Sequence, residues 1–249
     1  MRYLITFKDV ASKRILEEYN ASNIKLFSNL KNITVCELSE ESADELSRDD
    51  LILSVEIDCR DSFDAGGDSE SGVRSYAHDL LEVKKYHDLG YKGQGIKIAI
   101  FDSGIQKHEN LNIAGGFNAY DQNAPFDSNI NNSHGTMVAG VLAGKGINGA
   151  PLGVAPECEL YAVKLDDNVS TKNGSFWSEQ IAGMDWAINN NIDIINCSFS
   201  GLTDSIARRS AFKAAHEAGI IICCSAGNMQ NRVTDDRSTI GFPANYHLW

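Results

Sequence analysis

The stretch IKIAIFDSG, residues 96–104, decides the fold class of this protein. It begins with a run that is almost entirely apolar, and the run ends abruptly at Asp102, Ser103 and Gly104. A run of this kind is typical of a strand buried on both faces of a parallel sheet. In such a sheet the functional groups follow the carboxyl ends of the strands. The residues directly after each strand are therefore the first candidates for a functional site.

Short apolar runs alternate with amphipathic segments through the rest of the chain. The expected strands are residues 96–101, 160–165, 192–197 and 220–224. The expected helices are residues 79–88, 133–143, 176–189 and 205–217. In the second of these helices one face holds Met137, Val138, Val141 and Leu142. The alternation predicts an α/β fold, a doubly wound parallel sheet with helices on both faces.

The first part of the chain has a different order of elements. It reads strand, helix, strand, strand, helix, strand, over residues 3–7, 11–19, 24–27, 33–38, 40–46 and 51–57. This order is typical of a small α+β, ferredoxin-like domain. The segment CRDSFDAGGDSESGVRS that follows is acidic and rich in Gly and Ser, as flexible linkers are. We therefore divide the chain into a domain over 1–58, a linker over 59–75 and a larger domain over 76–249.

Composition excludes several classes of protein. The 249 residues are 43% hydrophobic and 22% charged, which is ordinary for a globular protein. The formal net charge is −12, and residues 1–70 carry −8 of it. Nucleic acids and membranes are not expected as partners, because binding to their anionic surfaces is favoured by clustered Lys and Arg.

The N-terminus, MRYLITFKDV, has neither the long apolar stretch nor the cleavage site of a secretory signal. This predicts a cytoplasmic location, in which the six Cys residues are reduced thiols.

Polar side chains follow three of the expected strands. Asp102 ends the first, Ser198 follows the Cys197 strand, and Asn228 lies shortly after the Cys224 strand. His134 opens a helix within the segment Ser133-His134-Gly135-Thr136. A carboxylate, an imidazole and an amide are thus expected to meet at one edge of the sheet.

Together these motifs resemble the subtilase family of subtilisin-like serine peptidases. Asp-Ser-Gly at 102–104, His-Gly-Thr at 134–136 and Ser-Ala-Gly-Asn at 225–228 have the order of that family. The stretches GVAPECELYAVKL (153–165), DWAINNNIDIINCSFSG (185–201) and GFPANY (241–246) agree with it. The resemblance covers residues 76–246 and is closest to the bacterial intracellular subtilisins. It implies a subtilisin-like fold that lacks its C-terminal part.

The resemblance implies a role for three residues in peptide-bond hydrolysis by an Asp-His-Ser triad. Asp102 would orient the imidazole, and His134 would act as the general base. Asn228 would donate a hydrogen bond to the oxyanion. No cofactor is required for this chemistry.

The resemblance also implies how a polypeptide substrate binds. Ser198, Phe199 and Ser200 would pair with extended substrate through main-chain hydrogen bonds. Ala226 and Gly227 would help to wall the primary specificity pocket.

The N-terminal domain resembles the subtilase propeptide, an inhibitor and folding assistant, most clearly in ITVCELSEESADELSRDDLILSVEID, residues 33–58. This implies that the chain's own propeptide lies in the active-site cleft. The junction would then fall near Phe63-Asp64.

The sequence departs from the family at the nucleophile. The Gly-Thr-Ser-Met-Ala segment that carries the family's serine does not occur in these 249 residues. Ser238 is the only serine after Asn228, and it lacks the flanking residues of that segment. We therefore expect this exact chain to be inactive. We also expect one face of the sheet to expose apolar surface, because the family's last strands and central helix are absent.

A structural calcium ion is an open question. The family's strong site aligns with Asn110 and Ile147, with Asn148 adjacent. Asn supplies an oxygen without a charge, so binding would be weaker if the site survives.

Three interpretations of the whole chain remain. The first is a subtilisin-like endopeptidase that is truncated here. The second is a non-catalytic pseudoprotease or inhibitor-like binding module. The third is a split enzyme in which a second chain supplies the serine segment.

Overall fold

A computed structural model describes residues 1–63, 76–127, 133–166, 174–228 and 240–246. The first unit contains, in order, β1 (Arg2–Phe7), α1 (Lys13–Glu18), β2 (Ser22–Leu26), β3 (Ile33–Glu37), α2 (Glu40–Leu46) and β4 (Ile52–Ile57). Its four strands form an antiparallel sheet in the order β2-β3-β1-β4. The predicted order of elements is confirmed. Helix α2 begins where its sequence predicts, because the Ser39 hydroxyl accepts a hydrogen bond from the Ser42 N–H.

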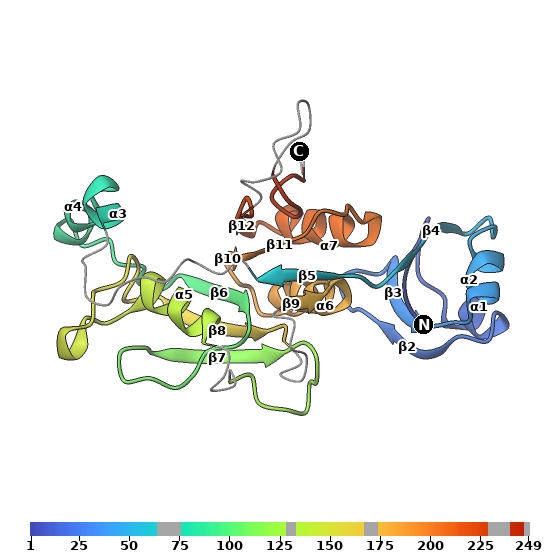
Figure 1. Ribbon diagram of the computed structural model, residues 1–249, viewed down its shortest axis with the longest axis horizontal. Coiled ribbons are helices and arrows are strands. Elements are labelled where there is room, and N and C mark those ends of the chain that lie inside the picture. The colour runs from blue at the N-terminus through green and yellow to red at the C-terminus, as the bar shows by residue number, and fades with distance from the viewer. Residues whose placement is uncertain (64–75, 128–132, 167–173, 229–239, 247–249) are drawn as a thin grey trace.

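The remaining elements form a larger α/β unit (Figure 1). They are β5 (Arg60–Phe63), α3 (Tyr76–Leu80), α4 (Val83–Asp88), β6 (Lys97–Asp102), β7 (Ile113–Asn118), α5 (His134–Ala143), β8 (Glu159–Lys164), β9 (Gly174–Phe176), α6 (Trp177–Asn189), β10 (Ile194–Cys197), β11 (Phe199–Ser200), α7 (Ile206–Glu217) and β12 (Ile221–Cys224), with a short 3-10 turn at Ile147–Gly149. Five strands form a sheet in the order β12-β10-β6-β8-β7, and every neighbouring pair is parallel. The predicted parallel sheet is confirmed.

Three details differ from the sequence prediction. The helix expected over 79–88 is two short helices, because Glu82 has a φ of +52° that no helix accommodates. Strand β7 was not expected, because its two glycines interrupt the apolar run. Strand β5 lies inside the segment assigned to the linker, because its main chain pairs with strands on both sides. Residues 64–75 of that segment lie outside the described residues.

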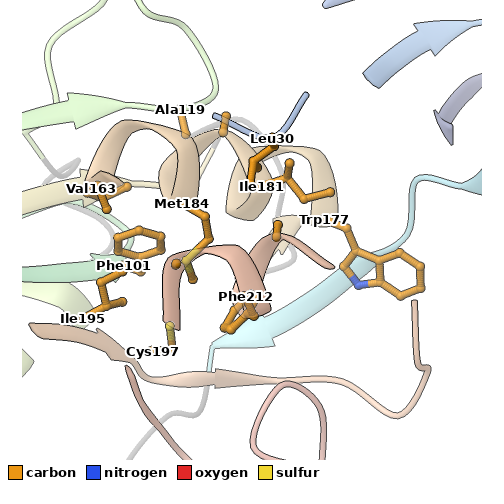
Figure 2. Packing of buried hydrophobic residues seen from close by; sticks show 14 of the residues in the cluster. Leu30, Phe101, Ala119, Val163, Trp177, Ile181, Met184, Ile195, Cys197 and Phe212 are labelled. Atoms are coloured by element: carbon orange, nitrogen blue, oxygen red, sulfur yellow. The ribbon is translucent and has the colours of Figure 1, made fainter. Parts of the chain in front are cut away.

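The two faces of the parallel sheet carry different residues of each strand. On β6, Ile98 and Ile100 pack on the α5 side, with Ala139 and Ala143. Ala99 and Phe101 alternate with them and pack on the α6 side, in the cluster that Figure 2 shows around Met184 and Ile181. Side chains of a strand alternate between its two faces, so Asp102 points to the α5 side. The N-terminal sheet packs against helices α6 and α7. Its residues Leu4, Ile33 and Val35 belong to the same apolar cluster as the buried residues of these two helices.

Helix α5 is apolar on a face that no other described element covers. The side chains of Met137 and Val141 are 59% and 62% exposed, whereas Ala139 is fully buried. The small residues of this helix pack on the sheet, and part of the apolar face identified in the sequence points outward. The exposure expected from the sequence is that of a sheet face, so the exposed face of α5 does not test that expectation. None of the helices in the described ranges is long and apolar enough to cross a membrane.

Candidate active site

The site begins with a hydrogen-bonded pair between the end of β6 and the start of α5. His134 Nδ1 lies 2.8 Å from Asp102 Oδ1 and 2.9 Å from Oδ2. The carboxylate is completely buried and also accepts a hydrogen bond of 2.7 Å from the Ser103 N–H. A proton on Nδ1 faces the carboxylate, so the lone pair of the neutral ring lies on Nε2. A proton taken up at Nε2 would give an imidazolium next to the Asp102 carboxylate, as the predicted role of this pair requires.

Neighbouring residues of both motifs hold the two elements together. The Gly135 N–H donates to Ser103 Oγ at 3.1 Å, and the Gln106 N–H donates to Thr136 Oγ1 at 2.9 Å. A Cβ on Gly135 would lie 2.4 Å from the carbonyl oxygen of Gly104. The glycine after His134 is thus needed for close approach of α5 to β6.

Asn228 lies shortly after β12, an edge strand of the sheet. Strand β10 lies between β12 and β6, the strand that ends at Asp102. The Ser225 N–H donates to the Cys197 carbonyl at 3.0 Å and extends the sheet beyond β12. Asn228 therefore lies at the same edge of the sheet as Asp102. Gly227 has a φ of +89°, and the Ala226 carbonyl accepts a hydrogen bond of 2.9 Å from the Gly241 N–H. The oxyanion and pocket roles of these residues remain predictions.

The residues after β10 bind an extended segment of the chain itself. Ser198 leads into β11, and Phe199 and Ser200 pair antiparallel with Phe63 and Ser62 of β5. Strand β9 pairs with the other edge of β5, so β5 is held on both sides by main-chain hydrogen bonds. The predicted substrate-pairing strand is thus occupied by an extended polypeptide.

A buried polar cluster beside β5 was not found by sequence analysis. Asp61 accepts hydrogen bonds from Trp177 Nε1 at 3.1 Å and Gln180 Nε2 at 3.0 Å, and it forms an ion pair with Arg208. Arg208 is fully buried. The sequence does contain a signal for this cluster. Arg208 lies on the same face of α7 as Ala211 and Ala215, which are both buried. An arginine on the buried face of an amphipathic helix requires a partner.

The loop aligned with the family's calcium site is held together by its own hydrogen bonds. Asn110 Oδ1 accepts from the Ile147 N–H at 3.0 Å, and Asn148 Nδ2 donates to Glu109 Oε1 at 2.7 Å. Among the described residues, no three His, Cys, Asp or Glu side chains are grouped closely enough to hold a metal ion. Asn110 Oδ1 and Glu109 Oε1 therefore each already accept a hydrogen bond within this loop.

The fold and the site define a class of protein. A buried Asp–His pair lies at the carboxyl edge of a parallel sheet, next to strands that bind extended polypeptide, and this is the arrangement of a serine-type peptidase on an α/β fold. The family model of the subtilase family matches residues 93–249. The chain belongs to the subtilase family.

The chain is similar to several members of this family. It is 33% identical to subtilisin E of Bacillus subtilis (strain 168) over 256 residues, which is 98% of this chain and 63% of that relative. It is 32% identical to the minor extracellular protease Epr of the same organism over 98% of this chain and 37% of that relative. The crystal structure of fervidolysin from Fervidobacterium pennivorans matches the fold with a TM-score of 0.72, at 23% identity, over 98% of this chain and 41% of that one. The chain thus spans less than two thirds of these relatives.

Proposed function

We propose that this chain carries the Asp–His part of a subtilisin-like serine endopeptidase, and that hydrolysis requires a serine segment that these 249 residues do not include. The observation that carries the proposal is the contact of both Asp102 carboxylate oxygens with His134 Nδ1. His134 would take the proton of the serine and pass it to the leaving amine. Asn228 would stabilise the oxyanion. Removing the serine from such a triad lowers turnover by about 10⁶, so the 249-residue chain is inactive by itself.

The polypeptide substrate would bind as an extended strand along β11. Support for this comes from the pairing of Phe199 and Ser200 with β5. Residues 1–63 would then act as a propeptide whose last strand fills the cleft. N-terminal sequencing of a processed form tests this role. We expect a new N-terminus just after Phe63-Asp64, and a start upstream of Ser54 would contradict it.

Intact mass after reaction with a fluorophosphonate probe tests the peptidase proposal. The natively produced protein should appear as a species heavier than 27.2 kDa that carries one adduct. Its peptide hydrolysis should be lost in His134→Ala. A species near 27 kDa with no adduct, no hydrolysis and no co-purifying chain that takes up the adduct would overturn the peptidase proposal and leave the binding module.

The second candidate is a non-catalytic, inhibitor-like binding module, and the pairing of β5 with both β9 and β11 favours it. A partner chain bearing the serine segment is the third, and its co-purification with the chain would identify a split enzyme. The cytoplasmic location remains a prediction that fractionation of the source cells would test. Structural calcium is a further proposal, tested by comparing thermal unfolding in Ca²⁺ and in chelator.

A further inference from the structure

The polar cluster around Asp61 is a pocket built for one chemical group. The carboxylate of Asp61 accepts hydrogen bonds from Trp177 and Gln180 and pairs with the guanidinium of Arg208. Asp61 is only 4% exposed and Arg208 is completely buried. Each of these three groups is a hydrogen-bond donor, and one of them is a cation that cannot lose its charge. An amide or an apolar side chain would leave this cation without a counter-charge.

The cation is held in place by groups other than Asp61. Arg208 Nε donates to the Tyr246 hydroxyl at 2.7 Å, and Nη2 donates to the Thr203 carbonyl at 2.9 Å. The guanidinium also lies over the Trp177 ring, 4.7 Å from its centroid. The pocket is therefore preorganised by α6, α7 and the segment that contains Tyr246. Asp61 occupies this pocket and does not create it.

The strand that carries Asp61 is bound mostly without regard to its sequence. Strand β5 pairs through its main chain with β9 on one side and β11 on the other. Of its described side chains, Ser62 is exposed and Arg60 is half-buried, whereas Asp61 is buried. Any extended polypeptide can make the main-chain bonds. The Arg60 side chain adds a hydrogen bond of 2.9 Å from Nη2 to the Gly174 carbonyl, but Asp61 is the buried side chain, so its position carries most of the selectivity.

The backbone of Gly201 limits how long an acidic side chain the pocket can accept. A Cβ on Gly201 would lie 1.9 Å from Asp61 Oδ1, so the carboxylate lies directly against the backbone of Gly201. A glutamate would have to fit one more methylene into the same space, and overpacking of this kind is unfavourable. Aspartate is therefore the better fit.

We propose that Arg208, Gln180 and Trp177 form a carboxylate subsite, so that polypeptides bound in place of β5 are selected for an aspartate at the position of Asp61, two residues before Phe63. The proposal rests on the proposed function, because it names the substrate class of the same cleft. The class is polypeptides with an acidic side chain at that position. The chain's own segment Arg60–Phe63 is then a member of that class.

Chemical rescue tests the pocket in the full chain. Asp61→Ala removes the equivalent of a formate ion, so sodium formate should raise the melting temperature of this variant by about 3 °C or more over sodium chloride at equal ionic strength. Formamide, the neutral analogue, should not. The rescue should be absent in the wild-type chain, in the double variant Asp61→Ala/Arg208→Met, and in Asp88→Ala, which removes an exposed carboxylate paired with Lys84. Equal shifts with formate and formamide would overturn the pocket.

Peptide binding tests the selectivity. A labelled peptide Arg-Asp-Ser-Phe should bind the Asp61→Ala chain at least about 30-fold more tightly than Arg-Asn-Ser-Phe, as expected for loss of one partner of a buried charge pair. The glutamate peptide should bind more weakly than the aspartate peptide. Equal affinities for the aspartate and asparagine peptides would overturn the proposal. So would rescue by formate without binding of any peptide, which would mean a structural ion pair only.

Two features keep this test separate from the proposed function. Asp61→Asn keeps the shape of the side chain, so it repeats the peptide comparison if Asp61→Ala does not fold. Neither readout needs hydrolysis. If a form that contains the serine shows no His134-dependent hydrolysis, while the chain still prefers the aspartate peptide, the peptidase proposal is contradicted and the subsite is supported. Hydrolysis without a preference for the aspartate peptide would support the peptidase proposal and contradict the subsite.

Discussion

Gly135, the second residue of α5, packs directly against Gly104, which follows β6. A Cβ at Gly135 would lie 2.4 Å from the Gly104 carbonyl oxygen and 3.0 Å from Asp102 Cβ. This approach brings the start of α5, and with it the ring of His134, to the carboxylate of Asp102.

Gly135→Ala should therefore push α5 away from β6. We expect a loss of about 1–3 kcal/mol in the free energy of unfolding, the usual cost of overpacking, measured by urea denaturation. In a form that contains the serine, hydrolysis should fall as well. Gly140→Ala is the matched control, because a Cβ at Gly140 on the same helix would meet no atom within 4 Å. That variant should gain about 0.5–1 kcal/mol. Equal effects at the two positions would contradict the close approach.

Glu179, near the start of α6, should make the stability depend on pH. Burial raises the pKa of this carboxyl from 4.5 to about 8, although Oε2 accepts a hydrogen bond of 2.6 Å from the Phe176 N–H. Between these two values the folded chain holds a proton that the unfolded chain has lost. The contribution of Glu179 to the free energy of unfolding should therefore be largest below about pH 4.5. It should fall by a few kcal/mol as the pH rises to 8.

Glu179→Gln should flatten this pH dependence, because the amide is neutral at every pH. A series of urea denaturations between pH 5 and 8 measures the slope. Some slope of the same sign should remain, since burial also raises the pKa of Asp58. An unchanged slope in the variant would show that Glu179 does not titrate in this range.

Asp185 on α6 should hold the N-terminal unit in place. Its Oδ1 accepts from the Asn29 N–H at 2.6 Å, and its Oδ2 accepts from the Ser28 N–H at 3.2 Å and from Ser28 Oγ at 3.0 Å. Asp185→Ala leaves these donors to water and should cost about 1–3 kcal/mol. Limited proteolysis between the two units should become faster.

Asp88→Asn is the control for that experiment. Asp88 forms an exposed i,i+4 pair with Lys84, and such pairs contribute about 0–1 kcal/mol. Its loss should leave proteolysis unchanged. Equal rates of proteolysis in Asp185→Ala and in the wild-type chain would show that the hydrogen bonds of Asp185 are not needed to hold the N-terminal unit against α6.

The exposed face of α5 should limit solubility. Met137→Lys places a charge on a side chain that is 59% exposed, so the free energy of unfolding should change by no more than about 0.5 kcal/mol. The concentration at which the chain aggregates, measured by light scattering, should rise. Ala139→Lys on the same helix should unfold the chain, because Ala139 is fully buried. A large loss of stability in Met137→Lys would mean that this face is covered.

Much of the architecture could be read from local patterns. The apolar run that ends at Asp102 predicted a strand of the parallel sheet, and the helix predicted over 40–46 has the bounds of α2. The break at Glu82 could not be predicted, because nothing in the local sequence requires a positive φ there. The role of Arg208 could not be assigned for a different reason. Its partner Asp61 lies 147 residues away in the sequence, inside a segment whose composition is that of a linker.

The sequence by itself determined the class of fold, the family and the identity of the Asp102–His134 pair, because these depend on periodicity and on short motifs at the ends of strands. Only the tertiary structure decided which face of α5 is exposed and which strand pairs with β11. It also decided that a buried arginine meets a carboxylate there. Such contacts join residues far apart in the chain, and local sequence patterns carry no information about which distant side chain completes a buried charge.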